Sequence, residues 1–103
     1  MLMQGSGTFC VEATLGSTVR PDDHLLVAAN GAYGKRMGVI AEYYRLNCHV
    51  MKFDETEPSA LRHRCLPDRA RGSDHVSVVH CETTTACSIL VKKLAAVLKR
   101  LKK

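Results

Sequence analysis

A short, unbroken apolar run at residues 24–29 constrains the fold more than any other feature of the sequence. The run reads HLLVAA and does not alternate with polar residues, which is typical of a strand covered on both faces. Two similar runs, CHVMKF at 48–53 and HVSVVH at 75–80, are predicted to be further strands. The three runs therefore indicate a sheet whose strands are separated by long connections.

Segments with helical spacing lie between these runs. The first covers residues 8–17, with Ser6 or Thr8 available as its N-cap. A second helix is predicted from Lys35 to Tyr44, a weak one near 59–65 and a further one at about 89–101. Turns or loops are predicted at 20–23, 30–34 and 82–88. The buried residues expected in the second helix are Met37, Ile40, Ala41 and Tyr44. Strands separated by helices imply right-handed crossovers. We therefore expect an α/β fold of three layers, α/β/α, around an incomplete and mainly parallel sheet.

The composition predicts a single domain without a membrane span. The chain has 103 residues, of which 46% are hydrophobic. No apolar run approaches the roughly 20 residues that cross a bilayer. Five cysteines at irregular spacings, with no secretory pattern at the start, are typical of reduced thiols. We therefore expect a cytoplasmic protein with a single domain over residues 1–103.

The formal net charge of +5 is unevenly distributed. Most of it comes from the arginines within residues 62–71 and from the basic tail, residues 92–103. In that tail, leucine and valine recur at helical spacing, which gives one apolar stripe and one cationic face. This pattern is normal for a helix that covers a sheet. The sequence therefore predicts neither nucleic acid nor a membrane as a partner.

The histidines and cysteines do not form a metal or catalytic motif. His75, His80, Cys81 and Cys87 lack the paired spacings of zinc sites, so no metal is expected. His80 and Cys81 are adjacent on a predicted strand and point to opposite faces, which argues against a cysteine nucleophile activated by its neighbour. No residue of the chain is therefore predicted to be catalytic.

Polar motifs fall where a parallel sheet usually binds ligands, beyond the carboxyl ends of the strands. Asn30-Gly31-Ala32-Tyr33 follows the first predicted strand, and His80 to Thr85 follows the third. The turn Gly5-Ser6-Gly7-Thr8 lies at a helix N-terminus, where free N–H groups and the helix dipole favour an anion. Together the three segments predict a site for a phosphorylated ligand.

Each motif also has a purely structural interpretation. A turn of the kind predicted at residues 5–8 caps a helix in many proteins that bind no phosphate there. Tyr33 is equally suited to packing, with its hydroxyl reaching water. Thr83, Thr84 and Thr85 are β-branched and suit a continuation of the third strand. These alternatives stay open on the motifs taken singly, and the argument for a site rests on their convergence.

The same motifs carry a resemblance to a known family. The order QGSGTFxVEA at 4–13, NGAYGKRM at 30–37 and VVHCETTT at 78–85 resembles fold-type I, pyridoxal-phosphate-dependent aminotransferases. More narrowly, it is similar to the 2-aminoethylphosphonate–pyruvate transaminases. The resemblance covers nearly the whole chain, with looser matches at 55–73 and after Thr85.

The resemblance implies a cofactor, a reaction and roles for five residues. The cofactor is pyridoxal 5′-phosphate. Ser6, Gly7 and Thr8 match the turn that holds its phosphate, Tyr33 matches the aromatic residue that stacks on its ring, and Thr83 matches the hydroxyl residue beside its phenolic oxygen. The partners are the amino donor 2-aminoethylphosphonate and pyruvate, and the products are phosphonoacetaldehyde and alanine. Family members are dimers, so we expect a homo-oligomer or self-association.

The chain also departs from the family pattern. The family's cofactor-binding lysine, the aspartate that pairs with the pyridine nitrogen and the substrate-binding arginine have no counterparts in the sequence. After Thr85 the family has a glycine and an Asn-Pro turn, where this chain has Ala86-Cys87-Ser88-Ile89-Leu90. Met1 is thus expected to match an internal position of a longer enzyme. We expect this chain alone to be inactive and to carry no covalently bound cofactor. The alternatives are a small non-catalytic module for a phosphorylated ligand and a non-functional truncated product.

Overall fold

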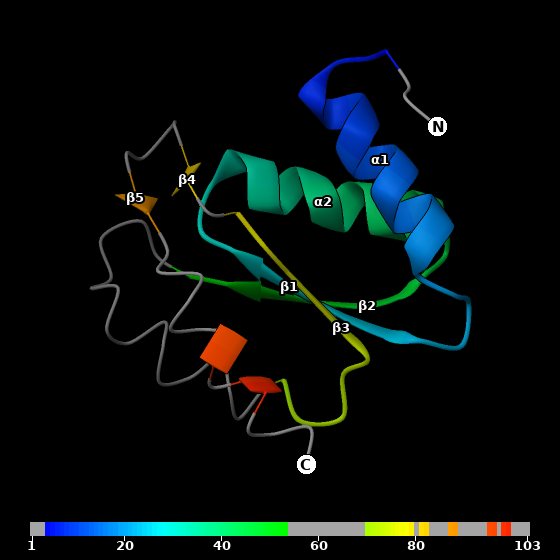
Figure 1. Ribbon diagram of the computed structural model, residues 1–103, viewed down its shortest axis with the longest axis vertical. Helices are drawn as coiled ribbons and strands as arrows, with labels where there is room; N and C mark the ends of the chain where they lie inside the picture. The colour runs from blue at the N-terminus through cyan, green and yellow to red at the C-terminus, as the bar shows by residue number, and fades with distance from the viewer. Residues whose placement is uncertain are drawn as a thin grey trace.

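The computed structural model describes residues 4–53, 70–79, 81–82, 87–88, 95–96 and 98–99. The elements in chain order are α1 (Gly7–Thr18), β1 (His24–Ala29), α2 (Ala32–Tyr43), β2 (Asn47–Lys52), β3 (His75–Val78), β4 (Cys81–Glu82) and β5 (Cys87–Ser88). Strands β2, β1 and β3 lie side by side in that order, and both pairs are parallel (Figure 1). The predicted α/β class and the parallel pairing are confirmed.

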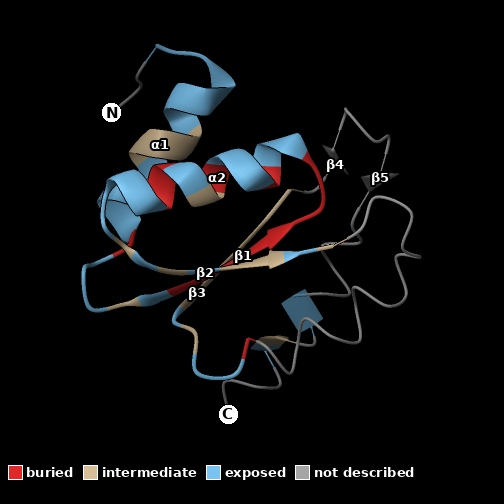
Figure 2. Cartoon of the chain, turned by 180° about the vertical axis from the view of Figure 1, so that it is seen from behind, coloured by how far each residue is buried: buried red, intermediate tan, exposed pale blue. Residues whose placement is uncertain are grey.

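Strand β1 is the centre of the molecule. Its residues 25–29 are all buried, as an unbroken apolar run predicts, and both of its edges are paired (Figure 2). Successive side chains point to opposite faces of the sheet, so Leu25 and Val27 enter one core cluster and Leu26 and Ala28 enter another.

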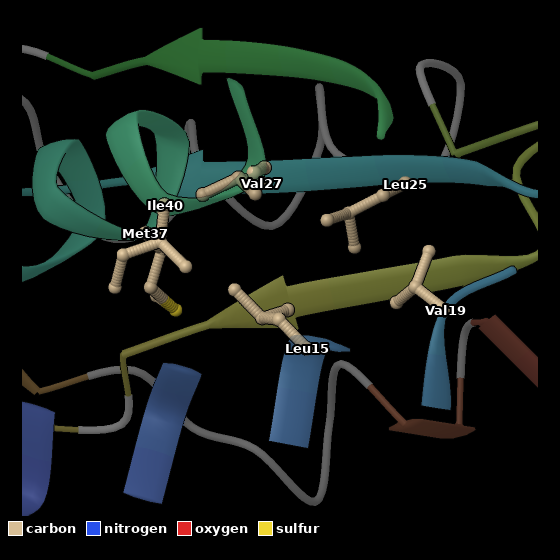
Figure 3. Close-up of a cluster of buried hydrophobic side chains, with 7 residues drawn as sticks. Leu15, Val19, Leu25, Val27, Met37 and Ile40 are labelled. Atoms are coloured by element: carbon tan, nitrogen blue, oxygen red, sulfur yellow. The ribbon is translucent and has the colours of Figure 1, made fainter. Parts of the chain in front are cut away.

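The first cluster lies between the sheet and the two helices. Helices α1 and α2 cover the same face of the sheet (Figure 1). Leu15 and Val19 come from the end of α1 and the residue after it, and Met37 and Ile40 project from α2 toward β1 (Figure 3). Burial of such side chains is worth roughly 1.5–3 kcal/mol each and holds this layer on the sheet.

The second cluster lies on the opposite face of the sheet. It joins Leu26 and Ala28 to Ala70, with Leu98 among the half-buried residues packed against it. Residues 95–96 and 98–99 are helical, in agreement with the predicted helix at 89–101 as far as the described residues reach. The predicted helix at 59–65 lies outside the described residues.

Three details of the predicted elements were wrong. Tyr44 is not buried: it is 42% exposed, because α2 ends at Tyr43 and the Tyr44 hydroxyl donates to Glu12 Oε1 of α1 at 2.9 Å. That bond and partial burial raise the pKa of Tyr44. Helix α2 begins at Ala32 rather than Lys35. The predicted loop at 82–88 contains strand residues instead, since β4 and β5 pair antiparallel.

Candidate functional site

The N-terminus of α1 has the geometry of an anion site. Ser6 is the N-cap: its Oγ accepts from the Phe9 N–H at 3.3 Å, and its carbonyl accepts from the Cys10 N–H at 3.0 Å. The N–H groups of Gly7 and Thr8 precede the first intrahelical bonds and point out of the helix. No acidic residue occupies the first turn. The positive end of the helix dipole is therefore not neutralised by a carboxylate from that turn.

Gly7 is not required by the packing of the chain. A Cβ built at this position meets no other atom within 4 Å. At Gly5, by contrast, a Cβ would collide with the ring of Phe9. A glycine beside open space leaves the backbone accessible for close approach by a ligand.

The start of α2 is positioned by a close contact with β1. A Cβ on Gly34 would lie 2.6 Å from the Cα of Ala29, so only glycine allows the helix to begin directly above the end of the strand. Tyr33 precedes this glycine and is 52% exposed. The contact therefore fixes where the Tyr33 ring stands relative to the carboxyl end of β1.

These two helix starts meet the end of β3 around one cavity of about 540 Å³, a size typical of small-molecule sites. Three segments that are far apart in the sequence form its walls. Its lining residues are Gly7, Thr8 and Val11 of α1, Tyr33, Arg36, Met37 and Ile40 of α2, and Val78 and Val79 at the end of β3. Among the described residues of this lining, Arg36 is the charged one and the others have neutral side chains.

The structure thus brings together three of the five predicted site residues, Gly7, Thr8 and Tyr33. Ser6 is adjacent, but its hydroxyl is used by the N-cap bond and it does not line the cavity. Thr83 lies outside the described residues. Of the three predicted segments, the glycine-hydroxyl turn and the segment after the first strand contribute Gly7, Thr8 and Tyr33 to this lining. The third predicted segment, residues 80–85, lies outside the described residues except for Cys81 and Glu82, and the lining contains Val78 and Val79 of the preceding run.

The sequence prediction missed Arg36 and the apolar lining. Arg36 follows Tyr33 by three residues, so one helical turn places both side chains on the same face of α2. That spacing was visible in the sequence. Val78 and Val79 belong to an apolar run that was predicted to lie in the core. No feature of this run distinguishes residues that line a cavity from residues that are buried in the core.

Asn30 follows β1 directly and is fully buried. In the part of the chain that the structure describes, neither its side-chain nitrogen nor its oxygen has a hydrogen-bond partner. A buried amide without partners is unfavourable by about 1–3 kcal/mol. This unpartnered amide lies at the carboxyl end of the central strand, directly before Gly31 and the start of α2.

The other cavities differ in character. One of about 590 Å³ runs between α2 and the outer strand β2, with Lys35, Glu42 and Lys52 on its rim. Cys48 lines it, and burial raises the pKa of this thiol, which disfavours a reactive thiolate. Among the described residues, no group of three histidine, cysteine or acidic side chains could hold a metal ion, and no helix is long and apolar enough to span a membrane.

The chain is similar in sequence to several proteins that have a functional name. No protein-family model matches the chain. Over 96% of its length, it is 50% identical to a 2-aminoethylphosphonate–pyruvate transaminase of Phocaeicola vulgatus, 48% identical to one of Bacteroides fragilis and 45% identical to one of Vibrio vulnificus. The chain spans only 27–28% of the length of these relatives.

A solved structure supports the same fold. The crystal structure of a ureidoglycine–glyoxylate aminotransferase from Bacillus subtilis matches 96% of this chain with a TM-score of 0.78, at 24% identity and over 26% of its own length. At that identity the likeness concerns the fold alone. Over nearly its whole length the chain is thus similar, at 45–50% identity, to 2-aminoethylphosphonate–pyruvate transaminases, of which it matches little more than a quarter.

Proposed function

We propose that residues 1–103 form part of the cofactor-binding large domain of a pyridoxal-phosphate-dependent aminotransferase. The reaction proposed for the whole enzyme moves the amino group of 2-aminoethylphosphonate onto pyruvate and gives phosphonoacetaldehyde and alanine. The names of the relatives support this reaction. The observation that carries the proposal is the cavity in which the N-terminus of α1, Tyr33 and the end of β3 meet.

The cavity suits the phosphate of this cofactor. The N–H groups of Gly7 and Thr8 and the hydroxyl of Thr8 provide donors, and the helix dipole favours a negative charge. Gly7 leaves space for the phosphate to approach the backbone. Arg36 supplies a positive charge, and the described part of the lining contains no acidic side chain that would oppose it. In this proposal Ser6 acts mainly by fixing the turn through its N-cap bond.

The cavity also suits an aromatic ring. Tyr33 is half-exposed at the start of a helix and lines the cavity, and an aromatic ring in this position is suited to stacking on a planar ligand. Val78, Val79 and Met37 add apolar walls. We assign Thr83, by the family motif, to the phenolic oxygen of the cofactor. When bound, the cofactor supplies the electron sink of transamination, and these residues hold and orient it.

We propose that this chain by itself has no aminotransferase activity. None of its lysines stands in the motif that carries the family's cofactor-binding lysine. A non-catalytic module that binds a phosphorylated ligand would use the same cavity, and a non-functional product would use none of it. Binding of a phosphorylated ligand therefore distinguishes the non-functional product from the other two possibilities.

Replacing Thr8 by alanine is expected to weaken phosphate binding by about 0.5–1.5 kcal/mol, because one hydroxyl donor is lost. Titration with inorganic phosphate, followed by the amide NMR signals of residues 5–8 and of Tyr33, measures the effect. Thr18→Ala is the matched control, since Thr18 lies at the far end of the same helix and bonds only to the Thr14 carbonyl there. Shifts confined to the basic tail would indicate nonspecific attraction and contradict the proposed site.

Borohydride treatment in the presence of pyridoxal phosphate is expected to label no single lysine stoichiometrically. The physical reason is that an exposed lysine reacts only as any amine does, without a site that orients it. Peptide mass analysis locates the labels, and an assay for alanine formation runs in parallel. One uniquely modified lysine together with turnover would contradict the proposed inactivity of this chain.

A further inference from the structure

The dipeptide Asp-His occurs twice, at the beginning of the two strands that pair in the sheet. Asp23 and His24 open β1, and Asp74 and His75 open β3. The structure crosses the two pairs: each aspartate contacts the histidine of the other strand. These contacts lie at the amino ends of the strands, at the opposite end of β3 from the cavity.

Asp74 holds the first residue of β1 through main chain and side chain. Its Oδ2 accepts from the His24 N–H at 2.9 Å and lies 3.6 Å from His24 Nδ1. The Asp74 N–H in turn donates to the His24 carbonyl at 2.9 Å. The Asp74 carboxylate therefore accepts a hydrogen bond from the backbone amide of the first residue of β1.

Asp23 makes the reciprocal contact. Its Oδ2 lies 3.1 Å from His75 Nε2 and accepts from the Arg20 N–H at 3.0 Å. The two side chains are 22% and 37% exposed, so solvent screens this pair less than it screens a fully exposed one. The hydrogen bond from the Arg20 N–H fixes the orientation of the Asp23 carboxylate, whose Oδ2 also contacts His75.

The pairing register makes these contacts specific. Leu25 is level with His75, so His24 is level with Asp74 and the two dipeptides are staggered by one residue. A slip that aligned them would set carboxylate beside carboxylate and imidazole beside imidazole. In a strand, the same slip also turns every side chain to the other face. We propose that the two Asp-His dipeptides form a register lock, which positions β3 on β1 and disfavours the aligned pairing.

The lock has a consequence for the cavity, and this consequence rests on the proposed function. Strand β3 carries Val78, and Val79 follows it into the cavity wall. A one-residue slip would move Val78 from its present face and displace Val79. The dipeptides at one end of β3 are thus positioning residues for the wall at its other end.

A swap of one dipeptide tests the lock without changing composition or net charge. The β3 swap combines Asp74→His with His75→Asp and places like groups together in the native register. We expect amide exchange at residues 75–78 to become roughly fivefold faster, and nuclear Overhauser contacts between Leu26 and Val76 to weaken. Adding the β1 swap, Asp23→His with His24→Asp, restores opposite partners and is expected to slow exchange again. Asp22→Asn, at an exposed neighbour in the same turn, is the control without effect.

Strand β2 serves as the internal reference. If the β3 swap speeds exchange equally in β2 and β3, the pairs act on overall stability and the lock is overturned. It is also overturned if the second swap brings no recovery. Phosphate titration of the same variants is scored separately: unchanged binding with a lost β3 register leaves the lock intact and contradicts the proposed cavity.

Acidification gives an independent readout. The Arg20 N–H bond first, and the His75 contact second, lower the pKa of Asp23. Because the folded-state pKa lies below the unfolded one, the contribution of Asp23 is present above the ordinary carboxyl range and is lost as pH falls through the lowered value. The protection factors at residues 75–78, in which the exchange rates are corrected for the pH dependence of intrinsic amide exchange, should therefore fall on acidification in the native chain, and Asp23→Asn should remove this step. An identical pH profile in the variant contradicts the lock.

Discussion

Replacing Gly34 by alanine is expected to destabilise the fold by about 1–3 kcal/mol, the usual range for overpacking a filled core. The new Cβ would lie 2.6 Å from the Cα and 3.0 Å from the Cβ of Ala29. Both atoms belong to the central strand, which is paired on both edges and has no freedom to move aside. Helix α2 must therefore shift, and Tyr33, the residue before Gly34, must shift with it.

Gly16→Ala is the matched control, because it makes the same change inside α1. A Cβ at Gly16 would lie 3.8 Å from the Tyr44 ring, an ordinary contact. Alanine is the better helix former, so this variant is expected to be more stable by roughly 0.5–1 kcal/mol. Urea unfolding of both variants measures the difference. Equal stabilities would contradict the close packing of α2 on β1.

The three strands of the parallel sheet were predictable because most of their residues are apolar, whereas β4 and β5 fall largely in a segment that was predicted to be a loop. β1 was predicted at its observed bounds, since the unbroken apolar run that follows His24 has few alternatives in a short chain. The start of α2 was not predictable in the same way. The sequence predicted a turn from Asn30, Gly31 and Gly34. In the structure Gly34 is a helical residue, and it is glycine because it packs directly against Ala29. A contact between two different elements leaves no pattern in the neighbouring sequence.

The cavity lining was predictable only in part. Gly7, Thr8 and Tyr33 were predicted as binding residues from their motifs, and the structure places all three in the lining of one cavity. Arg36 was missed, since a lysine-arginine pair on a helix usually faces solvent. Only the packed position of α2 shows that Arg36 lines the cavity, while the preceding Lys35 lines a different one.

The chain is expected to associate at micromolar concentration rather than remain a monomer. In the three-stranded sheet of the described residues, β2 and β3 are the outer strands, each paired on one edge only. Unpaired strand edges template pairing with other chains. Exposed apolar side chains on the helices, including Val39 and Tyr43, add a second source of attraction. The net charge of +5 opposes association, but most of it lies outside the strands.

A charge placed on the outer strand tests whether the edge is responsible. His49→Lys adds a positive charge at an exposed position of β2, whereas Ser17→Lys adds the same charge on α1. Because a charged side chain on an edge strand disfavours edge pairing, we expect His49→Lys alone to move association to higher concentration. Sedimentation velocity over a concentration series compares both variants with the native chain. An equal response of the two variants would assign association to overall charge.

A native chain that sediments as a sharp monomer and unfolds cooperatively would instead be a self-sufficient domain. The proposal that the chain forms only part of a larger domain would then have to be abandoned.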